Sequence, residues 1–130
     1  MLERNDSAIG QQGAQDQEGR ARALLLADII SDTPARDTVV LDIHELSPFA
    51  DYFVITAGEN ERQLRAINRT IIERMDEAGV RPRRSEGTAT GGWILLDFGD
   101  VLVHIFSVDQ REFYRLEDLW AEAPTLLAIQ

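Results

Sequence analysis

The sequence predicts an α/β (α+β) fold in which helices flank a five-stranded mixed sheet, and three stretches carry most of that prediction. Residues 51–58, DYFVITAG, are almost continuously apolar, as expected of a strand buried on both faces. Residues 60–79 place their apolar side chains on one stripe of a helix. Residues 93–96 and 101–106 are two strong strand signals joined by a short turn. A chain of 130 residues is long enough for one domain with a core of its own.

The N-terminal part of the chain predicts a tail, a helix and a strand. Residues 1–19 are polar, with few large apolar side chains, so we expect a flexible tail. A helix is expected over 20–31, where apolar residues that include Leu24 and Leu25 recur at helical spacing before Pro34. A strand is expected over 38–46, where apolar and polar side chains alternate.

The middle of the chain predicts a long helix followed by an edge strand. Asn60 is placed to cap the helix, and Gly79 is placed to end it in a left-handed conformation. The apolar stripe of this helix consists of Leu64, Ile67, Ile71, Met75 and Ala78. Residues 80–87 are expected to form a strand at the sheet edge, because Pro82 cannot donate a ladder hydrogen bond.

A last helix is expected from Asp109, with Glu112 three residues later completing a capping arrangement. It would place Phe113, Leu116 and Trp120 on one face and end before Pro124. Residues 123–130 are then expected to be a loose tail, so the folded domain is predicted over 20–122.

Composition narrows the classes of partner. The net charge is −10 and the pI is about 4.5, so the average field of the molecule repels phosphate backbones and anionic lipids but attracts basic proteins. No apolar run approaches the roughly 20 residues that cross a bilayer. The sequence contains no cysteine and no secretory signal, which fits a reducing compartment. We therefore expect a cytoplasmic protein with no membrane contact and little direct nucleic-acid contact.

The residues do not favour catalysis. Asp97-Phe98-Gly99 spells a kinase magnesium motif, but the chain contains no lysine and is too short for the other kinase motifs. A nucleotidyltransferase is the enzyme alternative. Such folds need a Gly-Ser turn and an Asp-x-Asp pair, whereas this chain has Gly58-Glu59 and separates Asp97 from Asp100 by two residues.

The remaining polar candidates are also weak. His44 and His104 are isolated and lack the spacing of metal ligands, so a structural or interface role is expected for each. Arg81, Arg83 and Arg84 are more typical of a guarded sheet edge than of an RNA site. We predict no catalytic, cofactor-binding or metal-binding residues.

The predicted hairpin defines two faces. If Phe98 and Gly99 form its loop, Asp97 lies opposite Asp100, Leu95 opposite Leu102, and Trp93 opposite His104. The other face is aliphatic and suits a core under helices. A turn with Gly99 as a bulge would shift the pairing by one residue, and we prefer the first register because it separates polar from apolar residues. The Trp93 side then suggests a docking site for a basic, partly apolar partner, unless the last helix covers it.

Three segments carry a family resemblance: DIHELSPFADYFVITAG (42–58), EG....GGWILLDFGDVLVHIF (86–106) and REFYRLEDLW (111–120). In order and spacing they resemble the ribosomal silencing factor, or Iojap, family. The resemblance implies a nucleotidyltransferase-like fold without the active site, and a factor that is not an enzyme. Such factors bind the large ribosomal subunit through ribosomal protein number fourteen, block joining of the small subunit, and repress translation when nutrients are scarce. A homodimer of the free protein is also implied, and the alternative is a dimeric adaptor for another basic partner.

Within that resemblance, the docking role is assigned to the hairpin and the last helix. Trp93 is the expected aromatic anchor, since such residues dominate interface energetics. The expected partner-binding residues are Trp93, Leu95, Asp97, Asp100, Leu102, Tyr114 and Glu117.

Overall fold

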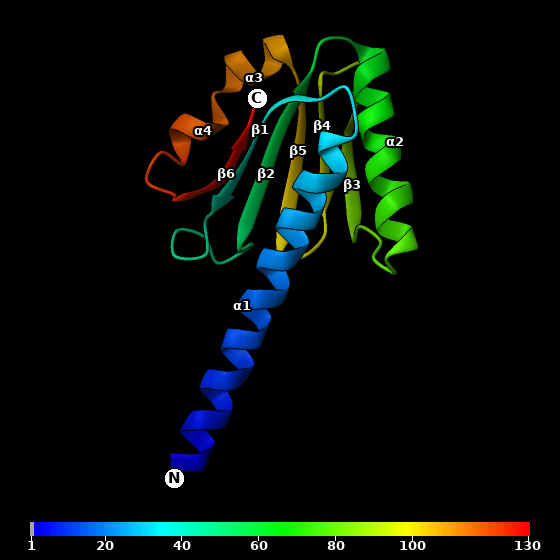
Figure 1. Cartoon of the computed structure of the whole chain (residues 1–130). Helices are drawn as coiled ribbons and strands as arrows, with labels where there is room; N and C mark the ends of the chain where they lie inside the picture. The colour runs from blue at the N-terminus through cyan, green and yellow to red at the C-terminus, as the bar shows by residue number, and fades with distance from the viewer. Residues whose placement is uncertain (1) are drawn as a thin grey trace.

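Six strands form one mixed sheet with helices on both faces in the computed structural model (Figure 1). The structure describes residues 2–130, with side chains from residue 17 onward. The strand order is β3-β4-β5-β2-β1-β6; β2 and β5 are parallel, and the other neighbours are antiparallel. The strands are β1 (Arg36–Asp42), β2 (Tyr52–Gly58), β3 (Arg84–Thr88), β4 (Trp93–Asp97), β5 (Val101–Ser107) and β6 (Thr125–Ile129). The helices are α1 (Leu2–Ser31), α2 (Glu61–Glu77), α3 (Val108–Tyr114) and α4 (Leu116–Leu119).

The β6 strand raises the strand count from the predicted five to six. It lies where the sequence suggested a loose tail, and it pairs antiparallel with β1, with Val39 opposite Ala128 and Val40 opposite Leu127. The TLLAI segment shows no alternation of polar and apolar side chains, and it forms a strand by pairing with the backbone of β1. The mixed α/β sheet flanked by helices is confirmed, with one more edge strand than expected.

One face of the sheet is covered by α1 and α2. The hairpin residues Ile94, Leu96, Val101, Val103 and Ile105 join the buried side chains of both helices in this layer, as predicted for the aliphatic face. Asn60 caps α2 by accepting a hydrogen bond from the Gln63 amide at 2.9 Å, and Gly79 has the left-handed φ of 80°. Ala78 departs from the predicted stripe, because it lies exposed at the C-cap of α2.

The first helix is longer than the predicted 20–31, because its helical backbone begins at Leu2. Its N-terminal part extends beyond the sheet in Figure 1. The part that packs on the sheet begins at the buried Gly19, one residue before the predicted range, and Leu24 and Leu25 are 37% and 39% exposed rather than buried. The predicted flexibility of residues 1–19 stays a prediction, and Met1 lies outside the described residues.

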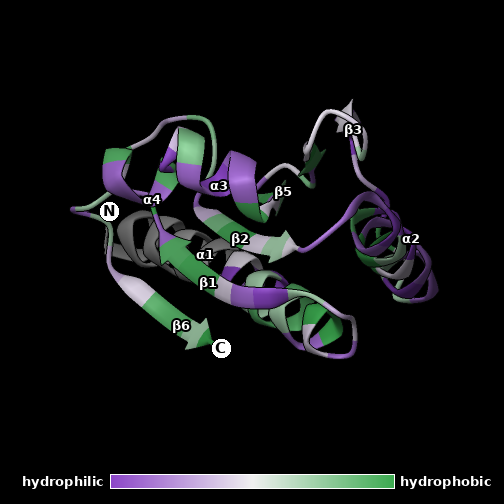
Figure 2. Ribbon diagram, turned by 90° about the horizontal axis from the view of Figure 1, so that it is seen from above, coloured by the Kyte–Doolittle hydropathy of each residue, from purple (hydrophilic) through white to green (hydrophobic). Residues whose placement is uncertain are grey.

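The opposite face of the sheet carries α3 and α4, and the two helical layers are seen on either side of the strands in Figure 2. The single last helix predicted from Asp109 is interrupted at Arg115, which takes a left-handed φ of 47° between α3 and α4. Ser107 caps α3 instead of Asp109, since its hydroxyl accepts from the Gln110 amide at 3.1 Å. Phe113 is consequently 77% exposed, while Leu116 and Trp120 pack toward the sheet.

Two predicted strands keep their place but change their bounds. The strand expected over 38–46 ends at Asp42, and residues 43–51 form a loop to β2. β3 is an edge strand as predicted, with every residue exposed, and it begins at Arg84 after Pro82.

Candidate functional site

The register of the β4–β5 hairpin differs from the preferred one by two residues. Trp93 lies opposite Phe106, Leu95 opposite His104, and Asp97 opposite Leu102. The Phe98 amide donates to the Val101 carbonyl at 2.9 Å, so the loop residues are Gly99 and Asp100. Gly99 takes the positive φ of 91° at the first loop position, as in type II′ turns. The predicted loop failed because Phe98 is buried under the helices and stays in the strand.

The two turn carboxylates therefore do not face each other. Asp100 accepts two hydrogen bonds from Arg22 of α1, at 2.8 and 2.9 Å, and so lies on the opposite side from Trp93. Its predicted place on the docking face is wrong. Asp97 keeps the predicted side, but its carboxylate already accepts from the Gly99 amide at 2.7 Å and pairs with Arg84 at 3.3 Å.

A two-residue shift preserves which side each strand residue faces, so the predicted strand residues other than Asp100 keep their side. We call it the Trp93 face: Trp93, Leu95, Asp97 and Leu102 on the sheet, with Tyr114 of α3 beside them. Leu102 and Trp93 pack at the margin of the core under α3 and α4, whereas Leu95 belongs to neither apolar core. The Tyr114 ring lies 4.6 Å from the Trp93 ring. The helices thus leave the β3–β4 end of this face half-open.

The side chain of His104 holds the Trp93 indole in place through a hydrogen bond. The Trp93 indole Nε1–H donates to His104 Nδ1 at 3.2 Å, which assigns the proton of the neutral imidazole to Nε2. That Nε2 is buried and has no partner within the described part of the chain. Burial lowers the pKa of His104 to about 4, so the ring is neutral near pH 7. A neutral acceptor fixes the indole, which limits the entropy that Trp93 would lose on binding a partner.

Beside Trp93 the surface is hollowed. A depression of about 250 Å³ is lined by Glu86, Gly87, Trp93 and Leu95. Gly87 has a φ of 83°, and a Cβ there would lie 2.0 Å from the Trp93 carbonyl oxygen, so glycine is required for β3 to approach β4. The hollow offers an apolar side chain of a partner a place next to the indole.

Two exposed phenylalanines extend the Trp93 face, and neither was predicted as part of it. Phe49, in the loop after β1, is 86% exposed and lines a hollow of about 450 Å³ with Leu102, Asp97, Arg83 and Arg84. Phe113, at the other end, contacts the Tyr114 ring at 5.1 Å. Phe49 could have been suspected, since a large apolar residue beside Pro48 in a loop has no obvious core to enter.

The charges around this face are mixed rather than acidic. Arg83 and Arg84 stand at the Phe49 end, so the predicted carboxylate rim is not formed there. Glu117 also has an internal role: Arg111 binds it at 2.6 Å and donates a further hydrogen bond to the Asp37 carbonyl. Arg111 thus links Glu117 of α4 to the start of β1, and no described contact joins Glu117 to Trp93.

The described residues contain neither a cluster of metal ligands nor a membrane-spanning helix. Among residues 17–130, no cluster of three or more histidine, aspartate or glutamate side chains has the arrangement of a metal site. No helix in the described part of the chain has both the length and the apolar character needed to span a bilayer.

Comparisons with known proteins point to a single family. Residues 16–130 match the family described as "Ribosomal silencing factor during starvation". The ribosomal silencing factor RsfS of Bacillus subtilis is 41% identical over 100 residues, covering 77% of this chain and 85% of the relative. A mouse protein, mitochondrial assembly of ribosomal large subunit protein 1, is 29% identical over 99 residues, covering 74% of this chain and 43% of that protein.

The three-dimensional comparison gives the same result. A crystal structure of a protein from Chromobacterium violaceum superposes with a TM-score of 0.73 at 31% identity, covering 81% of this chain and 85% of the other. The family match spans nearly the whole folded chain, and the sheet, its two helical layers and the hairpin lie within it. The chain therefore belongs to the ribosomal silencing factor family.

Proposed function

We propose that this protein binds the large ribosomal subunit through ribosomal protein number fourteen and thereby blocks joining of the small subunit. Translation would be repressed in this way when nutrients are limiting. Family membership supports the silencing role, and the family description names starvation as its setting. The printed name of the mouse relative, which refers to the large ribosomal subunit, favours that subunit as the partner.

The observation that carries the docking proposal is the half-open Trp93 face. It presents an indole pinned by His104, an apolar hollow between Trp93 and Leu95, and an exposed phenylalanine at each end. Rigid aromatic anchors of this kind supply much of the binding energy at protein interfaces. Leu102 and Tyr114 complete the apolar floor, and Asp97 contributes through its pair with Arg84.

Electrostatics supports a protein contact over an RNA contact. A chain with net charge −10 is repelled by the ribosomal RNA backbone and attracted to a basic ribosomal protein. Occupying the joining surface is enough to keep the small subunit away, so the proposal needs no cofactor and no turnover. Calorimetry with magnesium and nucleoside triphosphates is accordingly expected to give no binding heat.

Subunit joining is the direct test of the function. Purified subunits are mixed at a magnesium concentration that favours association, and joined ribosomes are followed by light scattering and gradient sedimentation. Increasing amounts of the protein should reduce the joined fraction. Unchanged joining at saturating protein would refute the anti-association role.

Single substitutions test the face itself. Trp93→Ala should weaken binding to the large subunit by about 2 kcal/mol, or about thirtyfold. Leu95→Ser is the second variant, since Leu95 belongs to neither core and its loss should leave folding intact. Leu25→Ala on α1 is the matched control, because Leu25 is 39% exposed on the opposite layer. If the folded Trp93→Ala and Leu95→Ser variants bound the large subunit as tightly as the control, the Trp93 face would not be part of the interface.

We further propose that the free protein is a homodimer in which this apolar face is covered by a second copy. Exposed apolar surface of this extent favours association. Dimerisation and docking would then compete for Trp93. Analytical ultracentrifugation should show dimers of the wild type and mainly monomers of Trp93→Ala, whereas equal dimer fractions would place the dimer contact elsewhere.

A further inference from the structure

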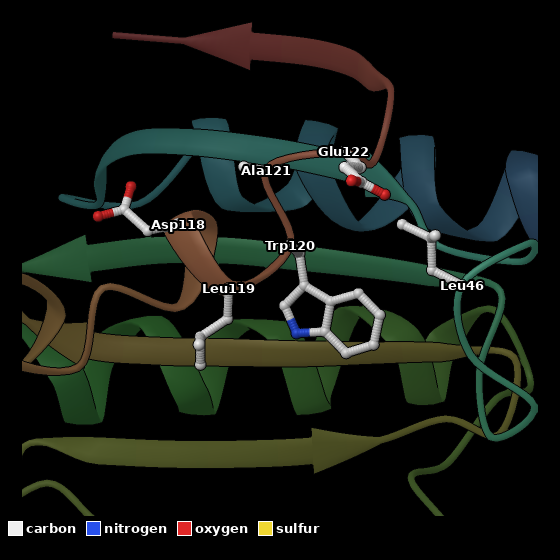
Figure 3. Close-up of a pocket in the computed structure, with 6 residues that line it drawn as sticks. All are labelled: Leu46, Asp118, Leu119, Trp120, Ala121 and Glu122. Atoms are coloured by element: carbon white, nitrogen blue, oxygen red, sulfur yellow. The ribbon is translucent and has the colours of Figure 1, made fainter.

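A second groove lies on the α3–α4 side of the sheet, between the loop after β1 and the turn that joins α4 to β6. Two adjoining hollows of about 390 and 320 Å³ share Leu46 and Glu122. Figure 3 shows the first of them, with the Trp120 indole directed toward the sheet and the Glu122 carboxylate turned toward Leu46. We call this the Leu46–Trp120 groove.

The groove presents apolar side chains to solvent. Leu119 is 76% exposed and Leu46 is 43% exposed. Trp120 is half-buried, and its ring contacts Phe53 of β2 edge-on at 5.1 Å, which holds the indole in position. Large apolar residues that gather on a surface in this way mark a contact site rather than a solvated surface.

The rim of the groove is acidic. Asp42, Glu45 and Glu122 line its two hollows, and Asp118 stands at its outer end. None of the thirteen arginines of the chain lines either hollow. Arg115 approaches the outermost carboxylate, Asp118, only at 3.9 Å. Within the described residues, Glu122 has no ion pair.

The exposed apolar side chains and the acidic rim together indicate what kind of partner would bind in the groove. We propose that the Leu46–Trp120 groove docks a basic protein segment that inserts a large apolar side chain against Trp120 and Leu119 while its arginines or lysines meet Glu122 and Glu45. Opposite charges at an interface increase the association rate and fix the register of the partner. The acidic rim expected around Trp93 is thus found on the same side of the sheet, at the β1–β6 end.

Charge argues against the other occupants. A second copy carries the same net charge of −10 and would bring further carboxylates toward the groove. Residues 1–19 contain four acidic residues and one arginine, so the N-terminal segment of this chain is also a poor match. A nucleic-acid backbone would be repelled by the same rim.

The groove adds a second point of attachment to the proposed function, on which the source of the basic segment rests. The segment would belong to a basic protein of the large subunit. Because the Trp93 face and the groove lie on one side of the sheet, one approach can engage both. Two linked contacts strengthen binding well beyond either contact alone.

The groove is tested first with a defined probe. The probe is a fluorescein-labelled peptide that alternates arginine with leucine, and the same peptide with glutamate in place of arginine serves as its counterpart. The arginine peptide should bind the wild type with a clear anisotropy change, and Glu122→Lys and Leu119→Ser should weaken it about tenfold each. Glu77→Lys, an equal charge reversal at an exposed position of α2, should bind the arginine peptide as the wild type does. Equal binding of both peptides, or of all variants, would overturn the proposal.

The second arm uses purified large subunits and separates this inference from the proposed function. Glu122→Lys and Leu119→Ser should each lower affinity for the subunit, with Glu122→Lys also flattening the salt dependence. If the wild type binds and blocks joining but neither variant is weakened, the groove proposal fails and the function stands. If the wild type does not bind the subunit, the function fails, and the peptide measurement still decides whether the groove takes a basic segment. Loss of affinity only at Trp93 would assign docking to the Trp93 face alone.

Discussion

His104 should make the fold sensitive to mild acid, and the structure gives the size of the effect. Its pKa falls from an ordinary value of 6.5 to about 4 because the ring is buried. The unfolded chain therefore takes up a proton as the pH falls through about 6.5, whereas the folded chain does so only near 4. The contribution of neutral His104 to the free energy of unfolding is fully present above about pH 6.5, and it is lost progressively as the pH falls to about 4. The full loss is about 3 kcal/mol, and about 2 kcal/mol is already lost at pH 5.

The assay is urea unfolding, followed by circular dichroism, at pH 7.5, 6 and 5 and one protein concentration. His104→Asn is the test variant, since its amide oxygen can accept from the Trp93 indole at every pH. The chain contains only one other histidine, His44, which is half-exposed beside Asp42, so His44→Asn is the control. Between pH 7.5 and 5 the wild type should lose about 2 kcal/mol more than His104→Asn does, and the loss in His44→Asn should likewise exceed that in His104→Asn.

Parallel pH profiles for the wild type and His104→Asn would refute the reasoning. They would mean that the folded protein accommodates the charged imidazole, through solvent access or a carboxylate, as readily as the unfolded chain does. The intrinsic cost of the substitution does not enter, because only the change with pH is compared.

Three further substitutions probe the fold. Asn60→Ala removes the cap of α2 and should cost about 1 kcal/mol in urea unfolding, whereas no change would show that the Gln63 amide is satisfied without it. Gly87→Ala should cost more than about 1 kcal/mol, because of its positive φ and the close Trp93 carbonyl; a neutral effect would contradict the close β3–β4 approach. Arg22→Ala should destabilise by about 1 kcal/mol or more, because Asp100 is left partly buried without its partner, and equal stability of Arg22→Ala and wild type would argue against that pair.

Side-chain periodicity was sufficient for most of the sheet and for α2. A strand buried on both faces, such as residues 52–58, and a helix with Leu64, Ile67, Ile71 and Met75 on one stripe each satisfy a pattern that few alternatives share. The side of the sheet that each hairpin residue faces was also predictable, because alternation depends on the strand alone.

The elements that the sequence did not predict depend on distant contacts. The turn settled on Gly99 and Asp100 because Phe98 is held in the core and Arg22, far away in the chain, binds Asp100. The strand β6 exists through its ladder with β1. Local sequence propensity does not reveal either of these long-range contacts. The predicted hairpin register was therefore wrong by two residues, and the C-terminal strand was not predicted.

The candidate site likewise has a part that the sequence predicted and a part that depends on distant contacts. Trp93, Leu95, Leu102 and Tyr114 were predictable as an apolar surface from the hairpin pattern and the helix that follows it. Their rim was not, because a carboxylate in sequence gives no sign of whether an arginine will pair with it, as Arg84 does with Asp97 and Arg111 with Glu117. Exposed Phe49 depends on how the loop after β1 closes over the sheet.

The placement of the indoles has a practical consequence. The chain contains two tryptophans, Trp93 and Trp120, and both belong to the apolar layer on the α3–α4 side. Intrinsic fluorescence excited in the indole band is therefore a label-free reporter of that side alone. A ligand that covers it should shift the emission to shorter wavelength by excluding water, while an event confined to α1 or α2 should leave the spectrum unchanged. Single Trp→Phe variants would then show which indole a bound ligand covers.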